Sequence, residues 1–132
     1  MEFAFVAPIL VTMFLGLVEY GWYFSQQNMA FNAVNSALRA GAQVTPGLTE
    51  PDGQCAACVA TAQSHLTVGL ANIGVSPSSP GELTPSIVAI GGTCALTVSV
   101  TVVHEPLAGL VPVPETYELR SSWMLLATEG CL

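Results

Sequence analysis

Residues 1–24 read MEFAFVAPILVTMFLGLVEYGWYF, and this stretch decides how the chain can fold. An uncharged run extends from Phe3 to Val18, bounded by the carboxylic acids Glu2 and Glu19. It is slightly shorter than the roughly 20 apolar residues that cross a bilayer as a helix. Because the run has no polar face, a domain of this size cannot bury it alone. We expect lipid or other subunits to cover it.

A secretory signal peptide is the closest alternative for this run. Such a peptide begins with a basic region and ends at a cleavage site made of small residues. The first 24 residues contain neither feature. A membrane helix usually takes its orientation from basic flanking residues. We therefore expect that a basic leader has been removed, which leaves Met1 or a nearby residue as the processed terminus.

The composition fits a chain that hides much of its surface in lipid or in a partner. Hydrophobic residues make up 52% of the 132 residues and charged residues 8%, against roughly 25% charged residues in an ordinary soluble domain. The net charge is -7, and Arg39 and Arg120 are the only arginine or lysine residues. Two cations cannot form the basic stripe that nucleic acid requires. Direct binding of DNA or RNA is therefore not expected.

The helical pattern continues beyond Glu19. Apolar residues recur at helical spacing at Phe24, Phe31, Val34, Leu38 and Ala42. The aromatic group of Tyr20, Trp22, Tyr23 and Phe24 is typical of a membrane-water boundary. The pattern predicts one helix of about 40 residues, roughly 60 Å long, whose first half needs neighbours and whose second half lies on its own domain. Pro8 should kink this helix or stretch one of its turns, because proline removes one backbone hydrogen bond.

Two domains are expected, a long helix over residues 1–43 and a globular head over 44–132. A second helix is predicted from about 54 to 73, with Asp52 as a candidate cap. Its inward positions are Cys58, Ala62, Leu66, Leu70 and Ile73. A loop rich in Pro, Ser and Gly follows over 74–86, and alternating apolar residues predict a β-hairpin over about 94–131. The fold class is therefore α+β, with the second helix packed on an antiparallel sheet.

The register of the hairpin depends on where its loop is centred. A centre between Pro112 and Val113 predicts four pairs: Val100 with Leu125, Val102 with Trp123, Val98 with Ala127, and Glu105 with Arg120. The same ladder brings Cys94 opposite Cys131, which predicts a disulfide. Cys55 and Cys58 then pair with each other or stay reduced, and we predict the disulfide. Paired cysteines indicate an oxidising compartment, and four buried free thiols are the alternative.

The chemical motifs have plainer explanations than catalysis. Cys55-Ala-Ala-Cys58 resembles a redox pair or half a zinc site, but the sequence has no second pair at metal spacing, and neither histidine lies in a ligand motif. Cys94 and His104 would lie ~33 Å apart on one strand, too far for a nucleophile and its base. The glycines of 81–92 lack the Lys-Ser/Thr ending of a phosphate loop. We predict no enzyme activity, cofactor or metal.

The first 43 residues resemble the start of TadE-like pilins, which belong to the tight-adherence branch of type IV pili. In that family a Glu-Phe pair opens a long apolar helix, a proline follows, and then come a Glu-aromatic-Gly step and a Gln/Ala/Asn-rich helix that ends near Arg-x-Gly. The matching positions are Glu2, Phe3, Pro8, Glu19, Tyr20, Gly21, Gln27, Arg39 and Gly41. About the last 40 residues are similar to the family's closing hairpin.

The resemblance implies a role for Glu2. In type IV pilins a glutamate near the mature N-terminus lies in the filament core and faces the α-amine of an adjacent subunit. That glutamate is usually the fifth mature residue, whereas here it is the second. A buried carboxylate must find a cation or become protonated, and no lysine or arginine precedes Arg39. The expected assembly residues are Glu2, Phe3, Phe5, Pro8, Phe14, Glu19 and Tyr20.

We therefore expect a structural subunit that polymerises through its apolar helix into an extracellular Tad-like pilus filament. The expected partners are copies of the same chain, the inner membrane before assembly, and the prepilin peptidase and assembly machinery that the resemblance implies. The competing function is a monomeric, membrane-anchored minor pilin or a binding component of a secretion or pilus assembly system. A redox protein that uses Cys55 and Cys58 is the third hypothesis.

Overall fold

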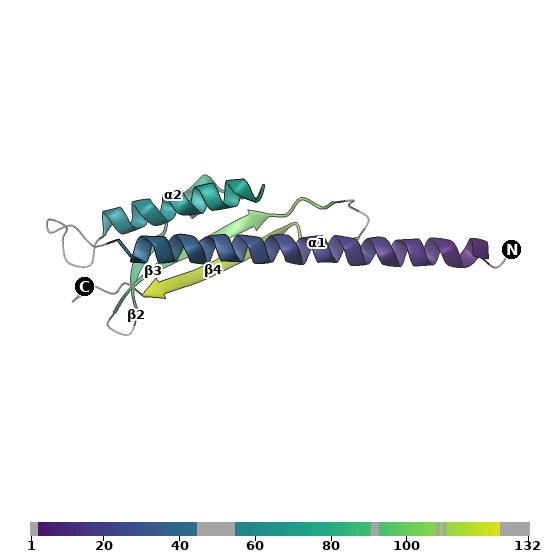
Figure 1. Cartoon of the computed structure of the whole chain (residues 1–132), viewed down its shortest axis with the longest axis horizontal. Coiled ribbons are helices and arrows are strands. Elements are labelled where there is room, and N and C mark those ends of the chain that lie inside the picture. The colour runs from purple at the N-terminus through teal and green to yellow at the C-terminus, as the bar shows by residue number, and fades with distance from the viewer. Residues whose placement is uncertain (1–2, 45–54, 91–92, 108, 110, 125–132) are drawn as a thin grey trace.

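The computed structural model describes residues 3–44, 55–90, 93–107, 109 and 111–124. The elements in chain order are α1 (Phe3–Ala42), α2 (Ala56–Asn72), β1 (Ser76–Pro77), the 3-10 helix η1 (Pro80–Leu83), β2 (Ser86–Ile90), β3 (Thr93–Val103) and β4 (Thr116–Met124). Figure 1 shows α2 and the sheet gathered along the C-terminal half of α1, while the other half projects freely. The predicted α+β fold class is confirmed.

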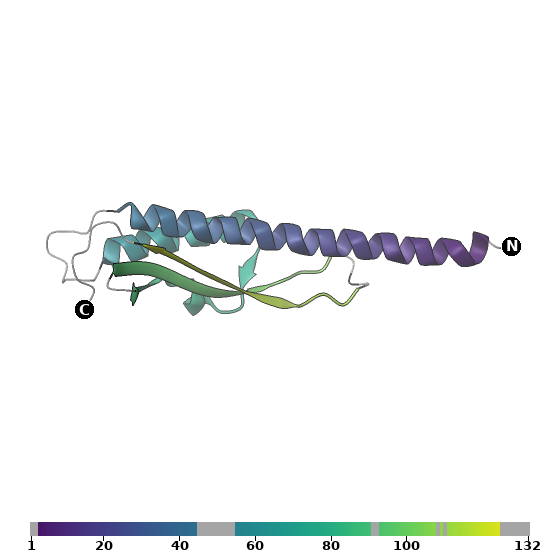
Figure 2. The same ribbon diagram turned by 90° about the horizontal axis from the view of Figure 1, so that it is seen from below.

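The long helix α1 has the predicted extent. It contains 40 residues, which corresponds to about 60 Å at 1.5 Å per residue. The helix continues through Pro8, and Figures 1 and 2 show no sharp kink along it. The expected kink is therefore absent. Pro8 lies close to the start of the helix, so only the hydrogen bond to the carbonyl of Ala4 is lost, while every later turn keeps its own.

The second helix begins later than its candidate cap suggested. Its N-cap is Cys55, whose sulfur accepts a hydrogen bond from the backbone N–H of Cys58 at 3.2 Å, and Asp52 lies outside the described residues. The predicted inward positions are buried in four cases, at Cys58, Ala62, Leu66 and Leu70. Ile73 is the C-cap residue and packs partly buried against the core.

The sheet is built around β3. Strand β4 pairs antiparallel with one side of β3, while β1 and β2 pair antiparallel with its other side. The sequence prediction missed β2, and it placed a loop where β1 and η1 occur. The missed signal for β2 is the apolar, β-branched stretch of residues 87–90 between Pro85 and two glycines, a pattern typical of a strand in a hairpin.

The predicted register between β3 and β4 is wrong by six residues. Val100 lies opposite Leu119, Val102 opposite Tyr117 and Val98 opposite Ser121. Trp123 lies opposite Leu96, and Arg120 lies opposite Ser99 rather than Glu105. The connection is therefore centred between 109 and 110, where Gly109 adopts a positive φ of 66°. Because side chains alternate with a period of two, an even shift leaves every residue on its predicted face, so the hydrophobic pattern could not reveal the error.

The core lies where α1, α2 and β3 meet. Its members include Val34, Leu38, Leu66, Leu70, Leu96, Val98 and Val100, all buried. The two helices approach closely because small residues face each other across their contact. A Cβ on Gly41 would lie 2.7 Å from the Cβ of Ala62 and 2.7 Å from the carbonyl oxygen of Cys58. This closeness holds the second half of α1 firmly against the head.

Candidate assembly surface

One face of α1 packs on the head of its own subunit. The described residues of that face are buried at Glu19, Tyr23, Gln26, Ala30, Val34, Ala37, Leu38, Gly41 and Ala42. Apart from Tyr23 and Leu38, they are small, β-branched or polar. Phe24 and Phe31, which the spacing placed on the inward side, are instead 55% and 45% exposed. The sequence pattern followed the largest apolar residues, whereas close packing on α2 selects small ones.

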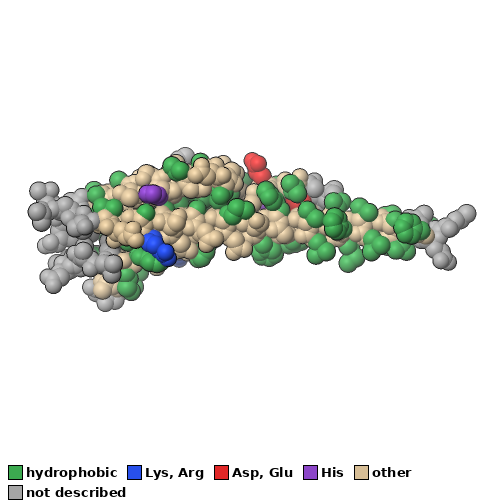
Figure 3. Space-filling model, in the orientation of Figure 1, with side chains coloured by type: hydrophobic (Ala, Val, Ile, Leu, Met, Phe, Trp, Pro, Cys, Tyr) green, Lys and Arg blue, Asp and Glu red, His purple; other side chains and the backbone are tan. Residues whose placement is uncertain are grey.

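The first half of α1 exposes large apolar side chains on all sides. The residues concerned are Phe3, Phe5, Val6, Ile9, Leu10, Val11, Met13, Phe14, Leu17 and Val18. Figure 3 shows hydrophobic side chains gathered along this projecting part of the molecule. No charged side chain lies between residues 3 and 18. A surface of this kind cannot remain in water and requires lipid or protein to cover it.

Three of these residues, together with Phe24 and Phe31 of the second half, recur at a spacing of seven. We call this set the heptad stripe, and it consists of Phe3, Leu10, Leu17, Phe24 and Phe31, with exposed fractions of 80%, 57%, 73%, 55% and 45%. At 1.5 Å per residue the stripe extends over about 42 Å. It therefore passes beyond the projecting half of α1 and continues beside the head.

The predicted assembly residues occupy different environments. Phe3, Phe5 and Phe14 are 80%, 79% and 66% exposed, and Pro8 and Tyr20 are also exposed. Glu19 is 1% exposed and faces its own head. Glu2 lies outside the described residues. The structure thus brings the aromatic residues to the surface and separates Glu19 from them.

Glu19 begins a series of polar contacts that tie the β3–β4 hairpin to α1. One carboxylate oxygen accepts a hydrogen bond from the backbone N–H of Leu107 at 2.9 Å. The remaining contacts are Tyr20 Oη donating to the Pro112 carbonyl at 3.4 Å, His104 Nδ1 with Gln26 Oε1 at 2.6 Å, and Ser121 Oγ donating to Asn35 Oδ1 at 2.6 Å. The guanidinium of Arg39 lies 4.8 Å from the ring centroid of Trp123. The sequence analysis did not predict these pairs. The signal that could have indicated them is the presence of polar residues on a helix face that is otherwise buried.

A comparison with models of known protein families finds a match over the long helix. Residues 1–42 match the family model described as TadE-like protein. The N-terminal segment is therefore similar to this family. The resemblance predicted from the sequence is confirmed over these residues, which include α1. No curated protein and no solved structure matches the chain.

A buried aromatic cluster joins the TadE-like helix to the hairpin. The ring of Tyr23 contacts His104 and Tyr117 edge-on, with centroid distances of 5.1 Å and 5.8 Å. Burial raises the pKa of Tyr117 above 10.0, and the neighbouring Tyr23 raises it further. Within the described part of the chain, Tyr117 Oη and His104 Nε2 are buried without a hydrogen-bond partner. The cluster is packed and covered, so it suits a structural role.

The cysteines stabilise the start of α2. Cys55 and Cys58 are joined by a disulfide, and both residues are buried, at 1% and 0% exposure. Thiol-disulfide exchange needs access to a sulfur, so this burial speaks against a redox role. Cys94 is also buried and disulfide-bonded. Its predicted partner Cys131 lies outside the described residues, and the ladder argument that paired the two no longer holds, so their pairing stays a prediction.

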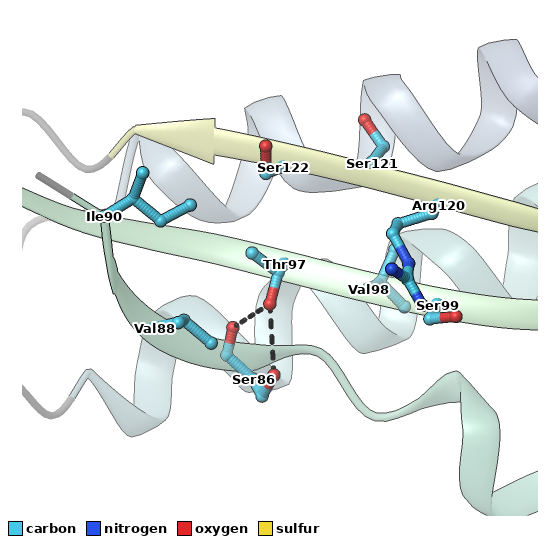
Figure 4. Close-up of a pocket in the computed structure, with 9 residues that line it drawn as sticks. All are labelled: Ser86, Val88, Ile90, Thr97, Val98, Ser99, Arg120, Ser121 and Ser122. Carbon is cyan, nitrogen blue, oxygen red and sulfur yellow. Dashed lines mark hydrogen bonds between the residues drawn. The ribbon is translucent and has the colours of Figure 1, made fainter.

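The outer face of the sheet carries a shallow groove that could be mistaken for a ligand site. It is lined by hydroxyl and aliphatic side chains of β2, β3 and β4, with Arg120 at one side (Figure 4). Ser86 and Thr97 hydrogen-bond each other across it. On the neighbouring strand surface, a hydrogen bond from Ser99 and the charge of Arg120 lower the pKa of Glu118. The groove contains no acid-base pair, and the described residues contain no cluster of metal-ligating side chains.

Proposed function

We propose that this protein is a structural subunit of an extracellular, Tad-like type IV pilus filament and that it polymerises through α1. The observation that carries the proposal is the length of the heptad stripe, about 42 Å at the helical rise. The hydrocarbon core of a bilayer is only about 30 Å thick. Lipid can therefore cover part of the stripe, but its end beside the head needs protein.

The pattern around the stripe favours another helix as that protein. Val6, Met13 and Tyr20 follow members of the stripe by three residues and are 49%, 65% and 42% exposed. Together the two sets alternate by three and four residues, which is the spacing of helices that pack side by side with interlocking side chains. A second copy of the chain offers the same surface, so copies can cover one another along α1.

Before assembly, α1 anchors the subunit in the inner membrane with its head outside the cytoplasm. The helix is long and apolar enough to cross a membrane, judged by length and composition. An oxidising compartment preserves disulfides such as that between Cys55 and Cys58. The prepilin peptidase and Tad assembly machinery are the partners at this stage, as the TadE-like segment implies.

Glu2 then enters the filament core and faces the α-amine of a neighbouring subunit. A buried carboxylate without a cation costs several kcal/mol, and Arg39 is the first basic side chain in the sequence. We expect Glu2→Ala to reduce polymerised subunit much more than membrane-inserted subunit. Equal loss from the fibre and membrane fractions would remove Glu2 from assembly.

The decisive variant is Phe31→Asp. Phe31 belongs to the stripe but lies beyond the reach of lipid, so a charge there should leave membrane insertion unchanged and abolish incorporation into fibres. Val68→Asp is the matched control, because Val68 is 59% exposed on the outer side of α2. The measurement is the amount of each variant in sheared fibres and in membranes. Undiminished incorporation of Phe31→Asp would contradict the proposal and favour a monomeric, membrane-anchored component.

A further inference from the structure

The connection between β3 and β4 is unusually apolar for a surface loop. Residues 106–114 contain no charge, lie between Glu105 and Glu115, and include three prolines. We call the described residues of this segment, 106, 107, 109 and 111–114, the proline loop. Leu107 is 58% exposed, and all three prolines are exposed. An exposed apolar segment flanked by single acids is typical of a docking surface.

The proline loop lies against α1 where the helix leaves the head. A Cβ on Gly16 would lie 3.5 Å from Val111 Cγ2. One turn later, Glu19 accepts the hydrogen bond from Leu107, and Tyr20 donates to the carbonyl of Pro112. Figure 1 shows this connection at the end of the head that faces the projecting part of α1. The loop and the projecting helix therefore form one continuous apolar surface.

The depth of the membrane follows from the charges on α1. The uncharged run between Glu2 and Glu19 corresponds to about 24 Å of helix at 1.5 Å per residue, less than the hydrocarbon core of about 30 Å. A hydrocarbon core of that thickness that begins at Phe3 extends past Glu19, to about the level of Trp22. Glu19 tolerates this position because the residue is only 1% exposed and its carboxylate accepts a backbone hydrogen bond. The proline loop, which covers Glu19, then lies at the same depth.

Part of the loop's backbone is suited to that depth. Non-helical backbone is tolerated near hydrocarbon only where its polar groups are satisfied within the protein. The N–H of Leu107 and the carbonyl of Pro112 have partners on α1, and prolines carry no N–H that would need one. Tyr20 and Trp22, 42% and 38% exposed, are at this level the residue types that favour the membrane interface.

We propose that the proline loop inserts into the outer part of the bilayer and seats the head on the membrane before assembly. The occupant is lipid, at the boundary between headgroups and acyl chains, and the contact is apolar because the loop carries no cation to attract phosphate. This inference rests on the proposed membrane stage of α1. It gives the head a fixed depth and orientation beside the helix, so that the heptad stripe is presented to neighbouring subunits.

Fluorescence quenching by brominated phosphatidylcholine tests this directly. The full chain, carrying Trp22→Phe and Trp123→Phe, receives a single tryptophan through Leu107→Trp and is reconstituted in vesicles at low protein density. Val68→Trp is the matched control, because Val68 and Leu107 are 59% and 58% exposed. Leu10→Trp reports on the anchor itself. Circular dichroism confirms that each variant retains its helices.

We expect fluorescence loss for Leu107→Trp and Leu10→Trp and none for Val68→Trp. Loss for Leu10→Trp alone would overturn the loop proposal and leave the anchor intact. If Leu107→Trp instead becomes blue-shifted and unquenched as protein density rises, a second copy covers the loop, and the lipid proposal is wrong. No loss at either position would overturn the membrane stage as well.

Discussion

The two halves of α1 differ in where their large side chains point. In Phe3–Val18, every large apolar side chain except Leu15 is exposed to 40% or more. In residues 19–42, one face is buried and consists mostly of small, β-branched and polar residues, while Phe24 and Phe31 are exposed. The two halves therefore need different partners. The face of the helix, rather than the half, decides which residues serve the subunit and which serve its neighbours.

The first prediction separates the two sets by stability. Leu38 is 1% exposed and Leu10 is 57% exposed on the same helix. Leu38→Ala should lower the free energy of unfolding by about 2–5 kcal/mol, because it leaves a cavity in the core. Leu10→Ala should change it little and should reduce fibre incorporation instead. Chemical unfolding of the full chain in detergent measures the free energy of unfolding of both variants. Equal destabilisation by Leu38→Ala and Leu10→Ala would contradict the distinction between the buried and the exposed residues of α1.

Replacing either of two glycines of α1 by alanine tests the difference between its buried and exposed faces. We expect the two variants to change the stability in opposite directions. Gly41→Ala places a Cβ 2.7 Å from Ala62 and 2.8 Å from Leu96 Cδ2, and overpacking of this kind costs about 1–3 kcal/mol. Gly21 has nothing within 4 Å of its Cβ position. Gly21→Ala should therefore stabilise the helix by about 0.5–1 kcal/mol. Thermal unfolding of both variants provides the comparison; stabilisation by Gly41→Ala would contradict the close helix contact.

Glu19 lies at the boundary between the halves, and its loss should act locally. Glu19→Ala removes the acceptor of the Leu107 N–H, and an unsatisfied buried donor costs about 1–3 kcal/mol. Hydrogen exchange at the Leu107 amide should accelerate. Glu19→Gln keeps an acceptor oxygen and should preserve most of the protection. Unchanged exchange in Glu19→Ala would show that other contacts hold the proline loop.

The smallest effect concerns pH at the junction of α1 and the hairpin. Because burial raises the pKa of Tyr117 above 10.0, the folded protein retains a proton that the unfolded chain releases. The associated stability is fully present below pH 10.0 and is lost as the pH rises through the folded pKa. Tyr117→Phe should flatten this alkaline decline. At neutral pH the variant should be at least as stable, because the Tyr117 hydroxyl has no hydrogen-bond partner among the described residues.

The periodicity of the sequence predicts the two helices and strands β3 and β4, but it does not predict the register in which the two strands pair. The spacing of apolar residues gave both helices, and strict alternation gave β3 and β4. The predicted register was wrong because an even shift preserves the alternation. The observed centre is accompanied by contacts from α1 to the hairpin connection, such as that of Glu19 with Leu107, which periodicity does not reveal. The prediction that Phe31 faces inward was wrong for a related reason. Helical spacing identifies the residues that share a face of the helix, but it does not say whether the subunit's own head or a neighbouring subunit covers that face.

The measurement that tests the account most directly is electron microscopy of fibres sheared from the source cells, with mass spectrometry of the fibre protein. We expect fibres composed mainly of this chain. Absence of the chain from fibres, with all of it retained in the inner membrane, would contradict a filament role and leave α1 as the anchor of a monomeric component.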